Sequence, residues 1–299
     1  MLSAPHPASG AIVRAAPALF AVIWSTGWIS AGYAAPYADP LTFLMIRHGL
    51  AAATLAVLVV LFGIAWPRRP RAIAHALIAG VLINGFYLAG VWWAVRQGVP
   101  AGMSGVIAAL QPILTAALAP LLVKEIVALR QWAGIALGFL GLCIAFAPRL
   151  AGLDESALKA ALVPISVNAL AMLSVTLGSF YQKRFATGGQ LAPMTALQFL
   201  GAVIVTVPLA ILFEPMQIEW NATVVLTMLW SVIVLSIGGV GLFAYMIRRG
   251  AVSKVAALIY LVPPVTALMA YVAFGETLTW VQIGGLALTV AGVFLATRE

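Results

Sequence analysis

The sequence has little charge and almost no cysteine. Charged residues make up 8% of its 299 residues, against roughly 25% in a soluble domain, so a water-soluble globular protein is excluded. The single cysteine, Cys143, cannot form an internal disulfide. The apolar stretches also lack paired aspartates, a Ser with a His, or a His-Glu metal motif, which an intramembrane enzyme would need. We therefore expect a protein that is not an enzyme and that uses no cofactor or metal.

Long apolar stretches make up most of the sequence. Hydrophobic residues make up 64% of the chain, and the mean hydropathy is +1.09. Ten stretches come close to the ~20 residues that cross about 30 Å of hydrocarbon. They cover residues 15–33, 41–65, 72–95, 100–123, 128–147, 157–181, 191–213, 221–247, 251–274 and 278–297. The sequence predicts an all-α membrane protein with ten transmembrane helices in the lipid bilayer.

The second half of the chain repeats the first. Residues 110–147 and 261–298 match at a constant offset of 151, with twelve identities in thirty-eight positions. The pairs Glu125/Glu276 and Gln131/Gln282 are among them, and polar identities are rare in such an apolar composition. We expect two repeats, 1–150 and 151–299, each with five spans. An odd number of spans places the second repeat upside down relative to the first, which is typical of a transporter with a central cavity.

Basic residues fall mostly on one side of this map. With a cytoplasmic amino terminus, the inner segments hold twelve of the sixteen Lys and Arg residues and the outer segments hold three. The positive-inside rule then predicts a multi-pass protein of the plasma (inner) membrane with both termini in the cytoplasm. The net charge of +8 comes from these inner loops, so no nucleic-acid partner is expected. The sequence leaves a monomer and a homodimer both open.

Three motifs carry a resemblance to a known family. They are Trp24-Ser-Thr-Gly27, the segment from Asp39 to Arg47 that enters the second span, and the doubled proline-to-glutamate-to-glycine block that ends the fourth and ninth spans. With these motifs the whole chain resembles the EamA-type exporters of the drug/metabolite transporter superfamily. The resemblance implies ten helices in two inverted five-helix repeats, a central substrate cavity and alternating access. The aromatic residues make it similar to the branch that exports aromatic amino acids.

Arg47 lies inside the second span, roughly 10 Å below its outer end by helical rise. An unpaired charge at that depth costs several kcal/mol. The repeat offset shifts slightly upstream, where Pro40-Leu-Thr42 matches Pro193-Met-Thr195, and the counterpart of Arg47 is then Leu200. The charge therefore belongs to one half only. Two interpretations stay open: a cation for a substrate carboxylate, or a structural arginine that bonds to carbonyls or extends to the surface. The adjacent His48 is a candidate for substrate binding or proton coupling, or else a hydrogen-bonded packing residue.

Other polar and aromatic residues are candidates for the same substrate site. Trp24, Asn84 and Tyr87 lie too deep for an interfacial aromatic belt, whereas Trp92 and Trp93 fit such a belt. The remaining candidates are Gln111, Asn168, Gln198, Trp230, Ser236 and Tyr260. For these, hydrogen bonds between helices are the alternative.

Three prolines lie at matching places within apolar helices. Pro112 and Pro263 are repeat counterparts, and Pro264 follows the second. A proline removes a backbone hydrogen bond and bends a helix. The pattern predicts paired hinges around a central path, with tolerated kinks of no functional weight as the alternative.

The charge inside the membrane favours one class of small-molecule substrate. Phosphate esters and nucleotide-type metabolites call for several cations, and lipophilic cations call for a buried carboxylate. A zwitterion with an apolar or aromatic side chain needs one cation, some amides and aromatic rings. We expect export of aromatic or other apolar amino acids. Export of lipophilic drugs or nucleotide-type metabolites is the alternative, and a structural or receptor-like membrane protein is the alternative of another class.

Overall fold

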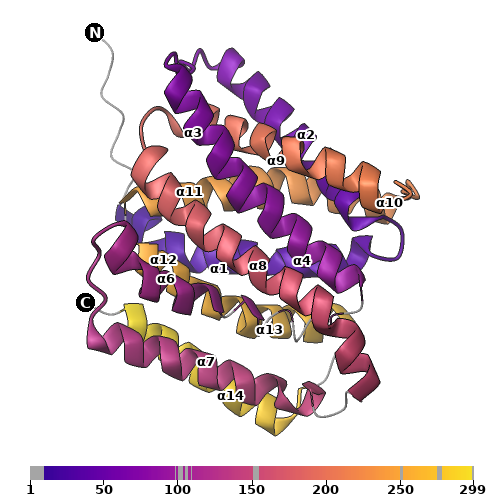
Figure 1. Cartoon of the computed structure of the whole chain (residues 1–299), viewed down its shortest axis with the longest axis vertical. Coiled ribbons are helices and arrows are strands. Elements are labelled where there is room, and N and C mark those ends of the chain that lie inside the picture. Colours follow the sequence, from indigo (N-terminus) through magenta and orange to yellow (C-terminus); the bar gives the residue numbers. More distant parts are fainter. Residues whose placement is uncertain are drawn as a thin grey trace.

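A computed structural model of the chain describes residues 10–97, 99, 104, 107–108, 110–150, 155–249, 252–274 and 278–297. Within these residues the secondary structure is helical, apart from one isolated antiparallel β-bridge between Ala38 and Ile218. The helices pack side by side in one bundle (Figure 1). The predicted all-α membrane fold is therefore correct, although the proposed boundary between residues 150 and 151 adjoins residues outside the described part and stays a prediction.

The helices follow the ten predicted spans closely. The first half contains α1 (Gly10–Ala34), α2 (Pro40–Leu61), α3 (Pro70–Gly80), η1 (Val81–Phe86), α4 (Tyr87–Arg96), α6 (Leu110–Leu122) and α7 (Leu129–Leu150). The second half contains α8 (Glu155–Phe185), α9 (Leu191–Phe213), α10 (Ala222–Trp230), η2 (Ser231–Val240), α11 (Gly241–Arg249), α12 (Val252–Ala257), η3 (Leu258–Leu261), α13 (Val262–Phe274) and α14 (Trp280–Thr297). The elements α3, η1 and α4 form the third span, and α10, η2 and α11 form the eighth.

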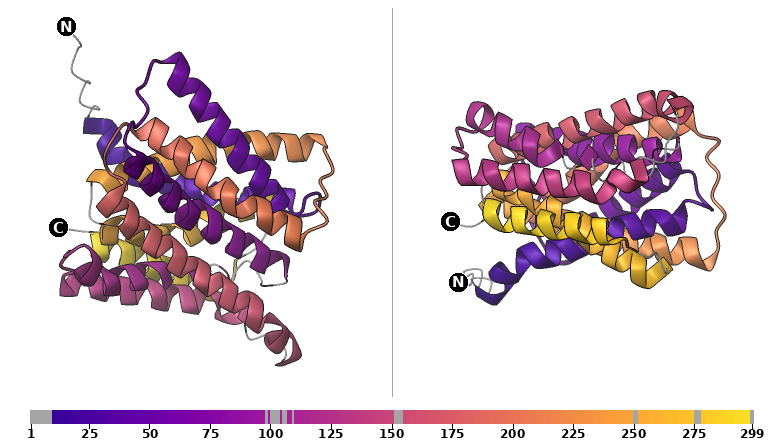
Figure 2. Two further views of the ribbon diagram at one scale, coloured as in Figure 1. Left: turned by 45° about the horizontal axis from the view of Figure 1, so that its top comes forward. Right: turned by 90° about the horizontal axis from the view of Figure 1, so that it is seen from below.

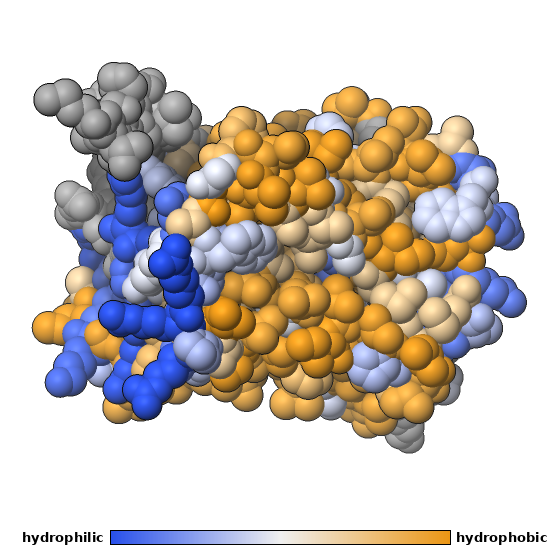
Figure 3. Space-filling view, turned by 90° about the horizontal axis from the view of Figure 1, so that it is seen from above, coloured by the Kyte–Doolittle hydropathy of each residue, from blue (hydrophilic) through white to orange (hydrophobic). Residues whose placement is uncertain are grey.

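Five described helices are both long and apolar enough to cross a membrane. They cover Pro40–Leu61, Pro70–Arg96, Leu162–Phe185, Leu191–Phe213 and Ala222–Arg249. Four shorter apolar helices accompany them. On the face of the molecule shown in Figure 3, an apolar belt lies between two polar ends. The apolar residues of these helices thus form a surface that faces the lipid.

The two ends of the bundle differ in charge. One end carries the loop before α2 and the loop between α9 and α10, with Asp39, Glu214 and Glu219; we call it the acidic face. The other carries the loops after α2, α6 and α8 with most of the basic residues, and we call it the basic face. The first turn of α1 and the last turn of α14 lie at the same end (Figure 2).

Helices α7 and α14 show how the repeats are inverted. A Cβ added at Gly134 would lie 2.6 Å from the carbonyl oxygen of Gly292, and one added at Gly285 would lie 2.6 Å from that of Gly141. The offset of 151 relates Gly134 to Gly285 and Gly141 to Gly292, so the two contacts are equivalent by the repeat. The two helices therefore run antiparallel with their backbones in contact, as small residues allow in a membrane.

The third and eighth spans share a feature that proline placement did not predict. Both contain a π-helical segment, η1 in the first repeat and η2 in the second, and the shift of 152 that relates Arg96 to Arg248 places η1 at 233–238, inside η2. Such segments are rare and frequently lie at functional sites. Among the proposed hinges, Pro263 and Pro264 lie in the first turn of α13, directly after the 3-10 turn η3, and Pro112 lies near the start of α6. Their role as hinges stays a prediction.

Candidate functional site

A small cavity lies near the middle of the bundle. Its volume is about 50 Å³, and four predicted residues, Trp24, Arg47, Asn84 and Tyr87, lie in its wall. The other lining residues are Gly27, Leu88, Val91, Trp92, Leu235 and Val240. The wall is built by α1, α2, η1 with α4, and η2, so both repeats contribute to it.

Arg47 is the charged residue of this cavity. Its side chain is 5% exposed, and its Nε donates a hydrogen bond of 2.9 Å to Ser236 Oγ in η2. Among the described residues it forms no ion pair with a carboxylate. A guanidinium has five N–H donors in a planar fork, so a single bond to a hydroxyl leaves most of its capacity unused. The side chain thus lies at the cavity and does not extend to the surface.

Asn84 contributes an unused donor to the same cavity. Its side chain is 1% exposed, and its Nδ2 has no hydrogen-bond partner among the described residues. Leaving a buried amide unsatisfied costs roughly 1–3 kcal/mol. At the offset of 152 that relates Arg96 to Arg248, the counterpart of Asn84 is Ser236. The two π segments therefore place equivalent polar residues at the cavity and at Arg47.

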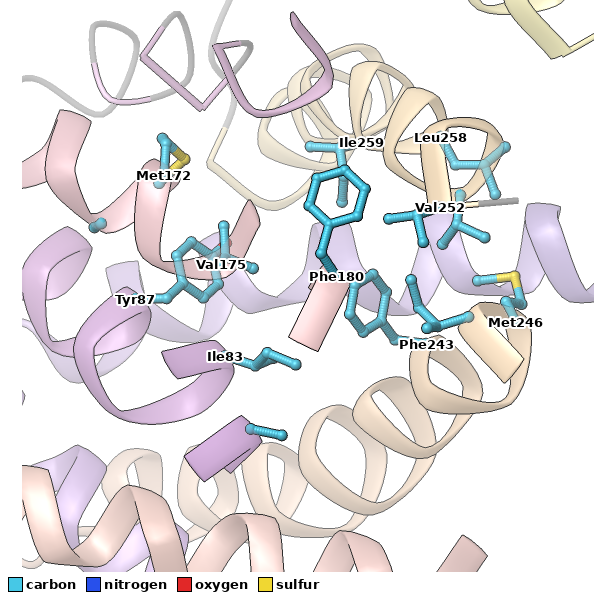
Figure 4. Close-up of a cluster of buried hydrophobic side chains, with 14 of the residues drawn as sticks. Ile83, Tyr87, Met172, Val175, Phe180, Phe243, Met246, Val252, Leu258 and Ile259 are labelled. Carbon is cyan, nitrogen blue, oxygen red and sulfur yellow. The ribbon is translucent and has the colours of Figure 1, made fainter. Parts of the chain in front are cut away.

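Apolar side chains close the cavity towards the basic face. Trp24 lies 5.0 Å from Phe20 and 5.7 Å from Phe243 between ring centroids. Phe243 belongs to a large hydrophobic cluster that also contains Tyr87 and Phe180 (Figure 4). The view shows side chains from the third span, α8, α11, α12 and η3 meeting there. This cluster separates the cavity from the basic end of the bundle.

The acidic face is closed by stacked rings and paired loops. Trp92 stacks on Phe43 with centroids 5.6 Å apart. Beyond them, Asp39 N donates to Gln217 O at 3.0 Å, and Gln217 N donates to Asp39 Oδ2 at 2.9 Å. Arg96 lies 3.6 Å from Asp39 as an ion pair. A polar recess of about 480 Å³ is lined by these two loops, so the cavity and the recess are separate.

The loops are also anchored to the start of α2. Glu214 accepts hydrogen bonds from the backbone N–H groups of Leu41 and Thr42 at 2.8 and 2.7 Å, and from the Thr42 hydroxyl at 2.8 Å. A carboxylate at a helix amino terminus satisfies orphan donors and complements the helix dipole. Arg47 is held on the same helix, two turns further in. The loop after α9 is therefore bound directly to the start of the helix that carries the cation.

His48 and Gln198 do not line this cavity. His48 is fully buried with its ring against Phe199 of α9, 6.0 Å between centroids, and neither ring nitrogen has a described partner. Gln198 lies where α9 packs on α3, since a Cβ at Gly80 would overlap its backbone. Their roles in binding stay predictions that would need a different conformation.

The other four candidates lie elsewhere as well. Asn168 donates a 2.7 Å hydrogen bond to Ser104 Oγ between helices. Gln111 is buried in α6, and Tyr260 of η3 packs against Gly138 in the cluster between α7 and α14. Trp230 is 45% exposed, and its Nε1 donates to Thr26 Oγ1 at 3.0 Å. In this conformation Asn168, Trp230 and Tyr260 make contacts between helices.

Two residues of the site had a weaker basis in the sequence. Trp92 lies near the membrane interface, a position that favours a belt residue, yet it lines the cavity. Ser236 is one of many small polar residues, and only its repeat relationship to Asn84 distinguishes it. Among the described residues, no group of three or more His, Cys, Asp or Glu could hold a metal ion.

Comparison with known proteins gives the same two-part organisation. The model of the EamA-like transporter family matches residues 15–147 and again residues 163–298. The "Probable amino-acid metabolite efflux pump" of Salmonella typhimurium is 26% identical over 286 residues, covering 93% of this chain and 92% of that protein. The protein of the same name from Escherichia coli is 24% identical, covering 85% and 89%.

Two further comparisons extend the similarity. The "Uncharacterized transporter YvbV" of Bacillus subtilis is 26% identical over 285 residues, covering 94% of this chain and 90% of that protein. A solved structure described as "Crystal structure of protein" has a TM-score of 0.79 and 19% sequence identity, covering 94% of this chain and 96% of that chain. At that identity the likeness concerns the fold alone.

Proposed function

Because this chain belongs to the EamA-like transporter family, we propose that it exports small amphipathic metabolites, with aromatic and other apolar amino acids as the preferred substrates, by alternating access. The observation that carries the proposal is one membrane-embedded cation, Arg47, beside an amide with a free donor, Asn84, in an otherwise aromatic and apolar cavity. That combination complements a carboxylate attached to an apolar side chain.

Each part of an amino acid has a matching group in this site. The Arg47 guanidinium can form charge-assisted hydrogen bonds to the carboxylate, which are the strong ones in a low-dielectric setting. The free N–H of Asn84 can add another. The faces of Trp24, Tyr87 and Trp92 can contact the side chain and attract the ammonium group. A nucleotide-type metabolite would leave phosphate charges unpaired with a single arginine, so we rank it below amino acids.

The size of the cavity supports a mechanism in which helices move. Ligand pockets typically measure about 300–1,000 Å³, and this cavity measures about 50 Å³. We therefore interpret the structure as a closed conformation. The third and eighth spans would move apart near η1 and η2, where the regular helical hydrogen bonding is already interrupted. Inverted repeats allow such rocking to open one face and then the other.

In this proposal the direction of transport follows from the charge difference between the basic and acidic faces. The basic face would lie in the cytoplasm by the positive-inside rule, and the acidic-face loops would open to release the substrate. Two relatives that carry the name "Probable amino-acid metabolite efflux pump" support amino acids as the substrate class. The inner membrane is then the expected location.

The test is transport by the purified protein in liposomes. A panel of labelled amino acids, their amides, phosphate esters and cationic dyes would be offered to wild type and to Arg47→Leu, which copies the repeat counterpart Leu200. We expect wild type to transport free apolar amino acids and to discriminate against the amides, which lack the carboxylate. Arg47→Leu should lose this preference. Transport of cationic dyes or phosphate esters alone, with the amino acids ignored, would contradict the proposal.

A further inference from the structure

An apolar groove lies on another side of the third span from the cavity. It has a volume of about 540 Å³ and runs between η1 with α4, α8, and the ends of α2 and α9. Leu170 and Phe213 at its rim are 63% and 62% exposed, within helices that carry the apolar belt. The groove is therefore open to the surrounding membrane.

The groove has the length of one membrane leaflet. Along α8 it extends from Val167 to Leu177, which at 1.5 Å per residue is about 15 Å. That is half of the ~30 Å hydrocarbon thickness. Leu41 at the start of α2 and Phe213 at the end of α9 place it in the half of the bundle next to the acidic face. Its dimensions match the chain of a lipid in that leaflet.

The lining offers almost nothing to water. Its residues with polar side-chain atoms are Ser174 and Trp93. Ser174 Oγ already donates a 2.9 Å hydrogen bond to the carbonyl oxygen of Leu82, in the π segment η1. A bound water typically needs two to four polar partners, whereas a hydrocarbon chain needs none and gains dispersion contacts with the wall. The groove is suited to apolar matter only.

A cation lies at the acidic-face end of the groove. Arg96 is three residues beyond Trp93, on the same side of α4, and its side chain is 56% exposed although it lies next to Asp39. An exposed arginine at that level can contact a headgroup phosphate. A tryptophan at the same end is typical of the membrane interface.

We propose that this groove binds an acyl chain of a phospholipid from the leaflet at the acidic face. The acyl chain lies between α4 of the first repeat and α8 and α9 of the second, so it contacts both repeats. It packs against one side of the third span, and the other side of that span carries Asn84 and Tyr87 in the cavity. This lipid site depends only on the membrane setting and not on which substrate is exported.

Photo-labelling tests the proposal on the intact protein. The protein would be reconstituted in vesicles of phosphatidylethanolamine and phosphatidylglycerol. A trace of phospholipid in these vesicles carries a diazirine in its acyl chain, and the labelled residues are mapped by peptide mass spectrometry. Ile233 in η2 is 57% exposed and is not in the groove, so it reports general contact with lipid. We expect labelling at Leu170 and its groove neighbours to exceed that at Ile233 several-fold.

Substitutions that fill the groove supply the second arm. Leu170→Trp, or Ala171→Leu at the wall, should lower the groove labelling to the level at Ile233, while the matched Ile233→Trp should leave it unchanged. Equal labelling of Leu170 and Ile233 in wild type would overturn the proposal, and this comparison needs no variant to fold. Groove labelling that persists in the filled variants would overturn it too. Neither result depends on transport activity.

Discussion

The Thr289 hydroxyl shares its proton between the carbonyl oxygen of Gly285 in its own helix, at 2.9 Å, and that of Gly138, at 3.3 Å. Gly138 and Thr289 lie 151 residues apart. The two residues are repeat counterparts, so the pseudo-twofold axis of the molecule passes close to this contact. The same symmetry recurs at the helix starts: Gln131 accepts from Ala128 N at 3.0 Å, and Gln282 accepts from Thr279 N at 2.9 Å. The duplication read from the sequence is thus present in individual hydrogen bonds.

The bond between Ser236 and Arg47 should determine selectivity for the carboxylate. Ser236→Ala removes a hydrogen bond to a charged group, which is worth about 1.5–3 kcal/mol, or roughly 10- to 150-fold in apparent affinity. We expect KM for free amino acids to rise by about this factor, with transport of the amides little changed. Ser236→Thr keeps the hydroxyl and should rescue transport.

Ser231 in the same π segment is the matched control for this experiment. Its hydroxyl is buried and has no described hydrogen-bond partner, so Ser231→Ala should leave the acid-to-amide preference unchanged. If Ser231→Ala and Ser236→Ala have equal effects, the bond to Arg47 is not what orients the cation.

Asn84 should respond differently to removal of its amide and to replacement of the amide by a carboxylate. Asn84→Ala removes a donor to the charged substrate carboxylate, a bond worth about 1.5–3 kcal/mol, so affinity should fall roughly 10- to 150-fold. Asn84→Asp places a carboxylate in the cavity beside Arg47, where it competes with the substrate. We expect it to abolish uptake of free amino acids in the liposome assay. Wild-type transport by Asn84→Asp would show that the amide does not face the substrate.

Two adjacent glycines of α14 should distinguish close packing against α7 from the intrinsic helix propensity of glycine. A Cβ at Gly285 would lie 2.6 Å from the carbonyl oxygen of Gly141, whereas one at Gly284 meets nothing within 4 Å. Gly285→Ala should cost about 1–3 kcal/mol through overpacking. Gly284→Ala should be neutral or stabilise the helix by roughly 0.5–1 kcal/mol. Thermal unfolding in detergent measures both, and equal melting temperatures would contradict the close helix contact.

A disulfide across the acidic-face loops should stop transport. Ala38 and Ile218 form an antiparallel bridge, and the Cα atoms of such pairs lie about 4.5–5.5 Å apart, within the range that a disulfide spans. In a Cys143→Ser background, Ala38→Cys with Ile218→Cys should cross-link under oxidation and block transport. Reducing agent should restore it. Full transport by the cross-linked protein would mean that these loops need not separate.

The charge difference between the faces predicts the topology. Reporter fusions after Glu299 and in the 68–71 loop should give cytoplasmic signals, and a fusion in the 214–219 loop should give an external one, because basic loops are retained in the cytoplasm. A carboxyl terminus outside the cell would reverse the proposed direction of transport. Opposite results for Glu299 and the 68–71 loop would also conflict with the even number of spans.

The sequence by itself determined the properties that depend on single residues or on sequence register. Hydropathy located the ten spans, the offset of 151 revealed the repeat, and the rarity of charge inside a span pointed to Arg47. Trp24, Asn84 and Tyr87 were also found, because each is too polar or too large for its depth. These inferences hold because the free energy of transferring a helix into lipid is nearly the sum of the contributions of its residues.

Only the tertiary structure decided which side of each helix faces the centre. In a membrane both the lipid and the protein interior accept apolar side chains, so a span has no strong amphipathic pattern that fixes its rotation. His48 therefore lies against Phe199 although its neighbour Arg47 lines the cavity. The bond from Arg47 to Ser236 joins residues 189 apart, and the π segments reflect small differences between helical hydrogen-bond registers. Such choices are made by packing, which no local pattern encodes.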